Sequence, residues 1–310
     1  MRPGSLVGPT TLATLACVTA AFCWGLNAVI AAGAFERGVT PERLAQARVA
    51  VALVPLATYL LLFRRDLVTP PRSAIGALIG FGVSMAVVNF TYYVAIDRVP
   101  VGVAISLQYT APVLVLIGTA LVTRRPPGPV AWTAAVVTLI GAVLVSGALT
   151  GLASADPIGL AAGIGAAVSF ATYLLSAELS GRRGARPVTS LLVGFVVASV
   201  LWAVVLPWWG WPFALLADPQ VSLRVVAVGL LGTLLPFFLV LSALRVISAV
   251  VAGIAATTEP VFAAALAWLL LGQSLGPAQV VGAALVVIGV LLAQVSRRPD
   301  PEAVPAEVAA

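Results

Sequence analysis

Charge is scarce in this chain of 310 residues. Only 9% of its residues are charged and 61% are hydrophobic, whereas a soluble domain carries roughly 25% charged residues. The chain therefore cannot cover its own surface with charge, and we expect lipid to be its solvent. Lysine and histidine are absent, so all 17 basic residues are arginine.

These absences argue against several classes of function. The arginines stand singly or in short clusters between apolar runs, which argues against nucleic-acid binding. Without histidine, Cys17 and Cys23 cannot complete a zinc site, and at ~1.5 Å per helical residue they lie about 9 Å apart, too far for a disulfide. No glycine-rich phosphate loop with a lysine is present, so ATP does not drive the protein through its own chain. We expect neither a metal nor a cofactor.

Long hydrophobic runs are what the chain does have. A helix needs about 20 apolar residues to cross a bilayer. Ten segments qualify, at residues 10–33, 41–63, 73–95, 100–122, 129–148, 157–178, 188–208, 222–244, 248–271 and 276–296. The predicted fold is therefore an all-α polytopic membrane protein with ten transmembrane helices.

The final third of the chain repeats its second quarter at a constant offset of 148 residues. The segment 109–113 (Tyr-Thr-Ala-Pro-Val) aligns with 257–261 (Thr-Thr-Glu-Pro-Val), and no gap is needed between Ala95/Ala243 and Leu144/Leu292. An odd number of spans separates the copies, so the second is upside down. We expect two inverted five-helix repeats around a central cavity, the usual construction of secondary transporters.

This repeat divides the chain into four predicted parts. They are a cytoplasmic N-terminus (1–9), a first repeat of five spans (10–148), an inverted second repeat of five spans (157–296) and a disordered cytoplasmic tail (297–310). With the N-terminus inside, 12 arginines lie on inner segments and 4 on outer loops. Because positive loops stay inside, both termini are expected in the cytoplasm of a bacterial cell, with the chain in its plasma (inner) membrane.

Short motifs resemble those of a known family. Trp24-Gly25-Leu26-Asn27 resembles its early Trp-Gly-x-Asn element, and Arg48 stands where the family usually has arginine. The segments 258–262 (Thr-Glu-Pro-Val-Phe) and 269–273 (Leu-Leu-Leu-Gly-Gln) resemble its Glu-Pro-Val-Phe and Leu-Gly-Glu pattern, with Gln273 in place of the usual glutamate. In order, they resemble the EamA-type transporters of the drug/metabolite transporter superfamily. The resemblance implies two five-helix repeats and export or exchange of small metabolites, often amino acids.

Polar side chains within the spans are the candidates for substrate binding, because polar groups in hydrocarbon are costly unless they face a cavity or one another. Asn89, Tyr92 and Tyr93 share one helical face through their i, i+3, i+4 spacing. The full expected set is Trp24, Asn27, Asn89, Tyr92, Tyr93, Gln108, Tyr109, Tyr173, Thr257 and Glu259.

Glu259 is the only acid deep within a span. An isolated carboxylate there holds a proton unless a cation or hydrogen-bond donors stabilise its charge. Three roles are open: it carries a coupling proton, it pairs with the amino group of a substrate, or it steadies the helix break at Pro260. Arg48 has two open roles, snorkelling to the headgroups or contact with an anionic group such as a substrate carboxylate.

Pro112 and Pro260 are repeat mates in mid-span. Each proline removes a backbone donor and leaves a carbonyl without its helical partner. We expect a hinge in each half, the alternative being static kinks that only shape packing.

The leading functional interpretation is a secondary transporter that exports or exchanges a small organic metabolite by alternating access. An amino acid or related zwitterion is preferred as substrate, largely on the family resemblance. A proton-coupled drug efflux carrier is the first alternative. It is disfavoured because span one lacks the acidic residue that small multidrug pumps have there. A passive channel and an intramembrane lipid-modifying enzyme are the others, the enzyme disfavoured because such enzymes need paired acids, histidine or a metal. The expected partners are the solute and the bilayer; the oligomeric state is open, and a monomer is compatible with the sequence.

Overall fold

The computed structural model describes residues 8–99, 101–124, 126–148, 156–271 and 275–295. It confirms the predicted all-helical fold, with ten helical segments long and apolar enough to span a membrane among these residues. Seven of these segments are single α-helices: α1 (Pro9–Phe35), α2 (Pro41–Phe63), α3 (Ile75–Arg98), α6 (Pro129–Ser146), α7 (Pro157–Arg182), α8 (Pro187–Val205) and α13 (Pro277–Val295).

The other three spans are interrupted. Span four consists of α4 (Val101–Gln108) and α5 (Ala111–Thr123), and span nine of α11 (Ala249–Ala256) and α12 (Glu259–Leu271). Span eight consists of α9 (Pro219–Gly229), the π-helical segment η7 (Leu230–Leu234) and α10 (Leu235–Ala243). Short 3₁₀ turns lie between α2 and α3, as η1 (Arg65–Leu67) and η2 (Arg72–Ala74), and between α8 and α9, as η5 (Trp208–Gly210) and η6 (Phe213–Ala217).

Three helices, α2, α7 and α9, begin with a proline that follows a capping side chain. Proline is tolerated in the first turn because its missing N–H has no helical partner there. Asp156 accepts from the Ile158 N–H at 3.3 Å at the start of α7, and Asp218 accepts from the Gln220 N–H at 2.8 Å at the start of α9. These caps satisfy backbone donors that would otherwise lack partners.

The helix boundaries follow the sequence repeat. Shifting α4 and α5 by 148 positions gives the bounds of α11 and α12, and shifting α6 reproduces α13 to within one residue. The two copies therefore fold alike, including the position at which their fourth spans break.

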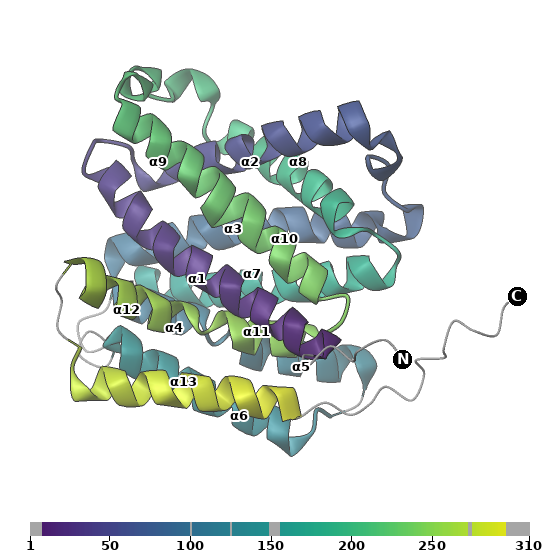
Figure 1. The fold of residues 1–310 in the computed structure, drawn as a ribbon, viewed down its shortest axis with the longest axis vertical. Helices are drawn as coiled ribbons and strands as arrows, with labels where there is room; N and C mark the ends of the chain where they lie inside the picture. Colours follow the sequence, from purple (N-terminus) through teal and green to yellow (C-terminus); the bar gives the residue numbers. More distant parts are fainter. Residues whose placement is uncertain (1–7, 100, 125, 149–155, 272–274, 296–310) are drawn as a thin grey trace, which may run out of the picture.

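Helices of one repeat pack on helices of the other (Figure 1). α6 lies along α13, α3 along α7, and α1 along α10. The α6–α13 contact is symmetric: Gly141 lies against the backbone of Gly282, and Gly289 lies against the backbone of Ala134. Gly289 is the repeat mate of Gly141, and Ala134 is the repeat mate of Gly282, so the second contact is the first with the repeats exchanged. This is the contact pattern of a two-fold axis between the repeats.

One contact ties the start of α11 to α7. Glu178, in the last turns of α7, accepts a hydrogen bond of 2.6 Å from the Ala249 N–H and forms an ion pair of 2.7 Å with Arg182. A carboxylate beside free N–H groups at a helix N-terminus is stabilising.

Candidate functional site

A cavity of about 420 Å³ lies between the two repeats. Both halves contribute to its wall, which is formed by Trp24, Asn27, Ala31, Phe35, Arg48, Val88, Asn89, Tyr92, Ile96, Ile105, Gln108, Tyr109, Phe170, Tyr173, Phe237 and Glu259. Its size and mixed lining suit one small solute, because such sites are mostly apolar with a few placed polar groups.

The structure brings eight of the ten expected site residues to this cavity. Thr257 is different: it is fully buried and its hydroxyl donates to the Ile254 carbonyl at 2.5 Å. Thr257 therefore does not line the cavity. Tyr93 lies in α3, but its side chain is outside the described residues.

The cavity is placed toward one end of the helices. On α1 it is lined between Trp24 and Phe35, the last residue of that helix, and on α3 between Val88 and Ile96. In the first halves of α1 and α3, the inward-facing residues Cys17 and Phe81 are instead fully buried in the core. The described structure is thus closed where α1 and α3 begin and hollow where they end.

Glu259 begins α12 and faces the cavity. Its Oε2 accepts a hydrogen bond of 2.5 Å from the Tyr109 hydroxyl, which comes from the break between α4 and α5. The bond links the broken spans of the two repeats, because Tyr109 belongs to the first and Glu259 to the second.

Arg48 does not snorkel. The residue is only 6% exposed, and its guanidinium points into the protein. It donates from Nε to the Thr233 hydroxyl at 2.7 Å, from Nη2 to the Gly232 carbonyl at 2.6 Å and from Nη1 to Asn89 Oδ1 at 3.2 Å. All three acceptors are uncharged, so nothing in this set neutralises the guanidinium.

Arg48 and Glu259 are the two charged side chains in the cavity wall. No salt bridge joins them within the described part of the chain, where all ion pairs involve residues at the ends of helices or in loops. The cavity therefore presents one guanidinium and one carboxyl group to a solute instead of pairing them with each other.

Aromatic rings form the closed end of the cavity. Phe170 and Tyr173 of α7 stack at 5.6 Å, and Phe237 of α10 meets Tyr173 edge-on at 5.5 Å and Trp24 at 5.7 Å. The Tyr173 ring is fully buried, and its hydroxyl has no hydrogen-bond partner among the described residues. Sequence reasoning missed Phe170 and Phe237, because an apolar residue in an apolar span carries no signal.

The two prolines stand directly after helix breaks, rather than at kinks inside continuous helices. Pro112 is in the first turn of α5 and Pro260 in the first turn of α12. Each lacks the N–H that would bond the carbonyl four residues earlier, at Gln108 and Ala256. Gln108 lines the cavity, so the C-terminal end of α4, with its partial negative charge, reaches the site next to Glu259.

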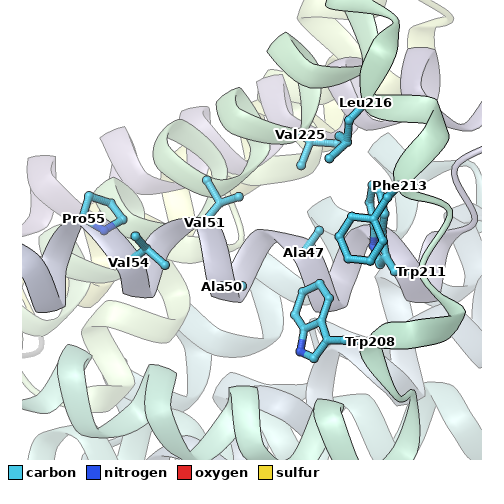
Figure 2. A pocket seen from close by; sticks show the side chains of 10 residues that line it. All are labelled: Ala47, Ala50, Val51, Val54, Pro55, Trp208, Trp211, Phe213, Leu216 and Val225. Carbon is cyan, nitrogen blue, oxygen red and sulfur yellow. The ribbon is translucent and has the colours of Figure 1, made fainter.

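A second hollow, of about 390 Å³, lies between α2, the η5–η6 connection and α9 (Figure 2). Its wall consists of Ala47, Ala50, Val51, Val54, Pro55, Trp208, Trp211, Phe213, Leu216 and Val225, all of them apolar. Because it offers no charge and no side-chain hydrogen bond beyond the indole N–H groups, it does not suit a polar solute. No cluster of metal-ligating side chains occurs in the residues that the structure describes.

Comparison with known proteins agrees with this architecture. The profile of the EamA-like transporter family matches residues 11–147 and again 157–294. The threonine/homoserine exporter RhtA of Escherichia coli strain K12 is 28% identical over 222 residues, covering 70% of this chain and 68% of its own. The uncharacterized inner membrane transporter YicL of Salmonella typhimurium is 27% identical over 302 residues, covering 94% and 98%.

A solved crystal structure has the same fold. It superposes with a TM-score of 0.73 at 21% sequence identity, covering 91% of this chain and 96% of its own. At that identity the likeness concerns the arrangement of helices alone.

Proposed function

This chain belongs to the EamA-like transporter family, and we propose that it exports or exchanges a small amino acid or related zwitterion by alternating access. It is a multi-pass membrane protein of a transporter family, not an enzyme. The cavity between its repeats is the proposed solute site.

The two unlike ionisable groups in the cavity wall, Glu259 and Arg48, carry this proposal. A zwitterion has an ammonium and a carboxylate on one carbon, and a site with one acid and one arginine offers a partner to each. Glu259, with the carbonyl end of α4 beside it, suits the ammonium, because half-helix C-termini in broken spans favour cations. Arg48 suits the carboxylate, because guanidinium and carboxylate match in geometry.

The relatives support an amino acid as the first choice of solute. RhtA is named an exporter of threonine and homoserine, and this chain covers 68% of its length. We therefore propose L-threonine and L-homoserine as the first compounds to test. A small solute of this kind fits within a cavity of about 420 Å³.

Export requires the cavity to open to either side in turn. We propose cytoplasmic termini, from the arginine distribution, which places the ends of α1 and α3 at the outer surface. The described structure then has its cavity on the outer side, with the aromatic cluster of Trp24, Phe170, Tyr173 and Phe237 sealing the inner side. In alternating access, the two inverted repeats exchange conformations, so that the cavity closes on the outer side and opens on the inner side.

Counter-exchange in proteoliposomes tests the proposal. Purified protein is reconstituted in vesicles loaded with unlabelled L-threonine, and uptake of labelled L-threonine is followed with increasing external concentration. We expect saturable exchange that L-homoserine competes for, while purines, sugars and cationic drugs do not. Exchange of a cationic drug, or flux that never saturates, would replace this proposal with an efflux carrier or a channel.

A further inference from the structure

Span eight contains a π-helical segment that the fold itself does not require. η7 occupies Leu230–Leu234, between α9 and α10. The equivalent span of the first repeat is α3, an uninterrupted α-helix from Ile75 to Arg98. Since one repeat builds this span without a π turn, η7 has a local cause, and single π turns in α-helices are frequent at functional sites.

What η7 contacts is Arg48. The Thr233 hydroxyl donates to the Val228 carbonyl at 2.9 Å, five residues earlier, and so turns its oxygen lone pair toward Arg48 Nε at 2.7 Å. Gly232, one position before it, gives its carbonyl oxygen to Arg48 Nη2 at 2.6 Å. Two successive residues of the π turn thus accept from Nε and Nη2, the two nitrogens of one edge of the guanidinium.

Glycine is needed at position 232 for this arrangement. A Cβ there would lie 2.1 Å from Asn27 Oδ1 and 2.5 Å from Asn27 Cγ, inside the van der Waals distance. Gly232 of η7 therefore lies directly against Asn27 of α1, while its carbonyl oxygen accepts from Arg48 of α2.

Counting donors shows what remains for a solute. A guanidinium has five N–H donors in a planar fork. Thr233, Gly232 and Asn89 accept one each, which leaves two, one on each Nη, without an acceptor among the described residues. The two that remain are on the two terminal nitrogens of the guanidinium, and a guanidinium binds a carboxylate through N–H groups on two of its nitrogens.

We propose that η7 sets the substrate specificity of the carrier: it fixes Arg48 so that two free N–H groups select solutes with a carboxylate. Arg48 is the specificity residue and Thr233 is a positioning residue that acts through it. This inference rests on the proposed function, because it assigns the carboxylate end of the zwitterion.

The test compares L-threonine with L-threoninamide, which keeps the ammonium and the hydroxyl but has no carboxylate. In reconstituted wild-type protein, the KM for counter-exchange should be at least about tenfold lower for the acid than for the amide. Thr233→Val removes the lone pair that holds Nε and should lower this preference roughly three- to tenfold. Thr233→Ser keeps the hydroxyl and should restore the wild-type ratio.

A matched control is Thr189→Val. Thr189 is also buried, and its hydroxyl also donates to a backbone carbonyl, that of Leu67 at 2.7 Å, but it lies outside the cavity wall. The Thr189→Val variant should leave the ratio of the two KM values, for L-threonine and for L-threoninamide, unchanged. A generic loss of folded protein lowers the number of active carriers in every variant, whereas the ratio of the two KM values reports only on recognition.

The outcomes separate the two proposals. If wild-type protein exchanges no zwitterion, the proposed function fails. If it exchanges L-threonine and Thr233→Val keeps the wild-type ratio, the function stands and the positioning role of η7 is overturned. Should Thr233→Val give no folded protein, the same comparison is made with Thr233→Ala, where an unchanged ratio overturns the positioning role of η7 and a lowered ratio supports it.

Discussion

Replacing Gly141 with alanine should destabilise the protein, because this glycine lies at the closest approach of α6 and α13. An added Cβ would be 2.7 Å from the Gly282 carbonyl oxygen and 2.7 Å from the Val286 nitrogen. Both are backbone atoms that cannot rotate away, so the two helices have to separate by several tenths of an ångström along their contact. Close packing across small residues is what holds membrane helices together.

The magnitude follows from two opposing effects. Overpacking of this kind costs about 1–3 kcal/mol, whereas glycine to alanine within a helix gains at most about 1 kcal/mol of helix propensity. We expect a net loss of about 1–2 kcal/mol. In a protein of this size that corresponds to a Tm roughly 2–8 °C lower.

The measurement is thermal unfolding of purified protein in one detergent at one heating rate, since membrane proteins often unfold irreversibly. Gly289→Ala should behave similarly, because its Cβ would lie 3.0 Å from the Ala134 carbonyl oxygen and 1.9 Å from Thr138 Oγ1. Gly76→Ala is the control, as nothing lies within 4 Å of an added Cβ there. A Tm for Gly141→Ala no lower than that of Gly76→Ala would refute the close two-fold contact.

Three further predictions concern transport and topology. Glu259→Gln should abolish uptake driven by a pH gradient in proteoliposomes. If the variant still performs counter-exchange in the same vesicles, Glu259 is assigned to proton coupling, and if counter-exchange is also lost, to substrate contact. Unchanged uptake in both assays would leave Glu259 a structural role alone. Pro112→Ala and Pro260→Ala should each slow transport more than they lower the yield of folded protein, and equal losses of both would favour static kinks. Single cysteines replacing Arg124 and Gly272, in a background without the native cysteines, should react with a membrane-impermeant maleimide from opposite sides, and labelling from one side would contradict inverted repeats.

The arrangement of helices was predictable from sequence because lipid imposes simple demands. Every span has to be about 20 apolar residues long, and its backbone has to satisfy itself, so the ten runs translate directly into helices. The offset of 148 residues then indicated the two repeats, and the shared bounds of α4 with α11 and α5 with α12 follow from it.

The cavity was predictable only in its polar part. Asn89, Tyr109 and Glu259 stand out because a polar residue in an apolar run needs a reason. The burial of Arg48 was not predictable, because it depends on acceptors in η7, Gly232 and Thr233, which lie far from Arg48 in the sequence. A π turn of five residues leaves no periodicity that would reveal it. Thr257 misled because a threonine hydroxyl can bond its own helix instead of a cavity, as it does with Ile254.

The placement of Arg48 and Glu259 in different repeats limits the symmetry that the cavity can have. Arg48 is encoded in the first repeat and Glu259 in the second, where the position equivalent to Glu259 in the first repeat is Ala111. Two identical halves around a dyad would present every side chain of the cavity twice, so a site with one arginine and one acid requires two halves that differ in sequence.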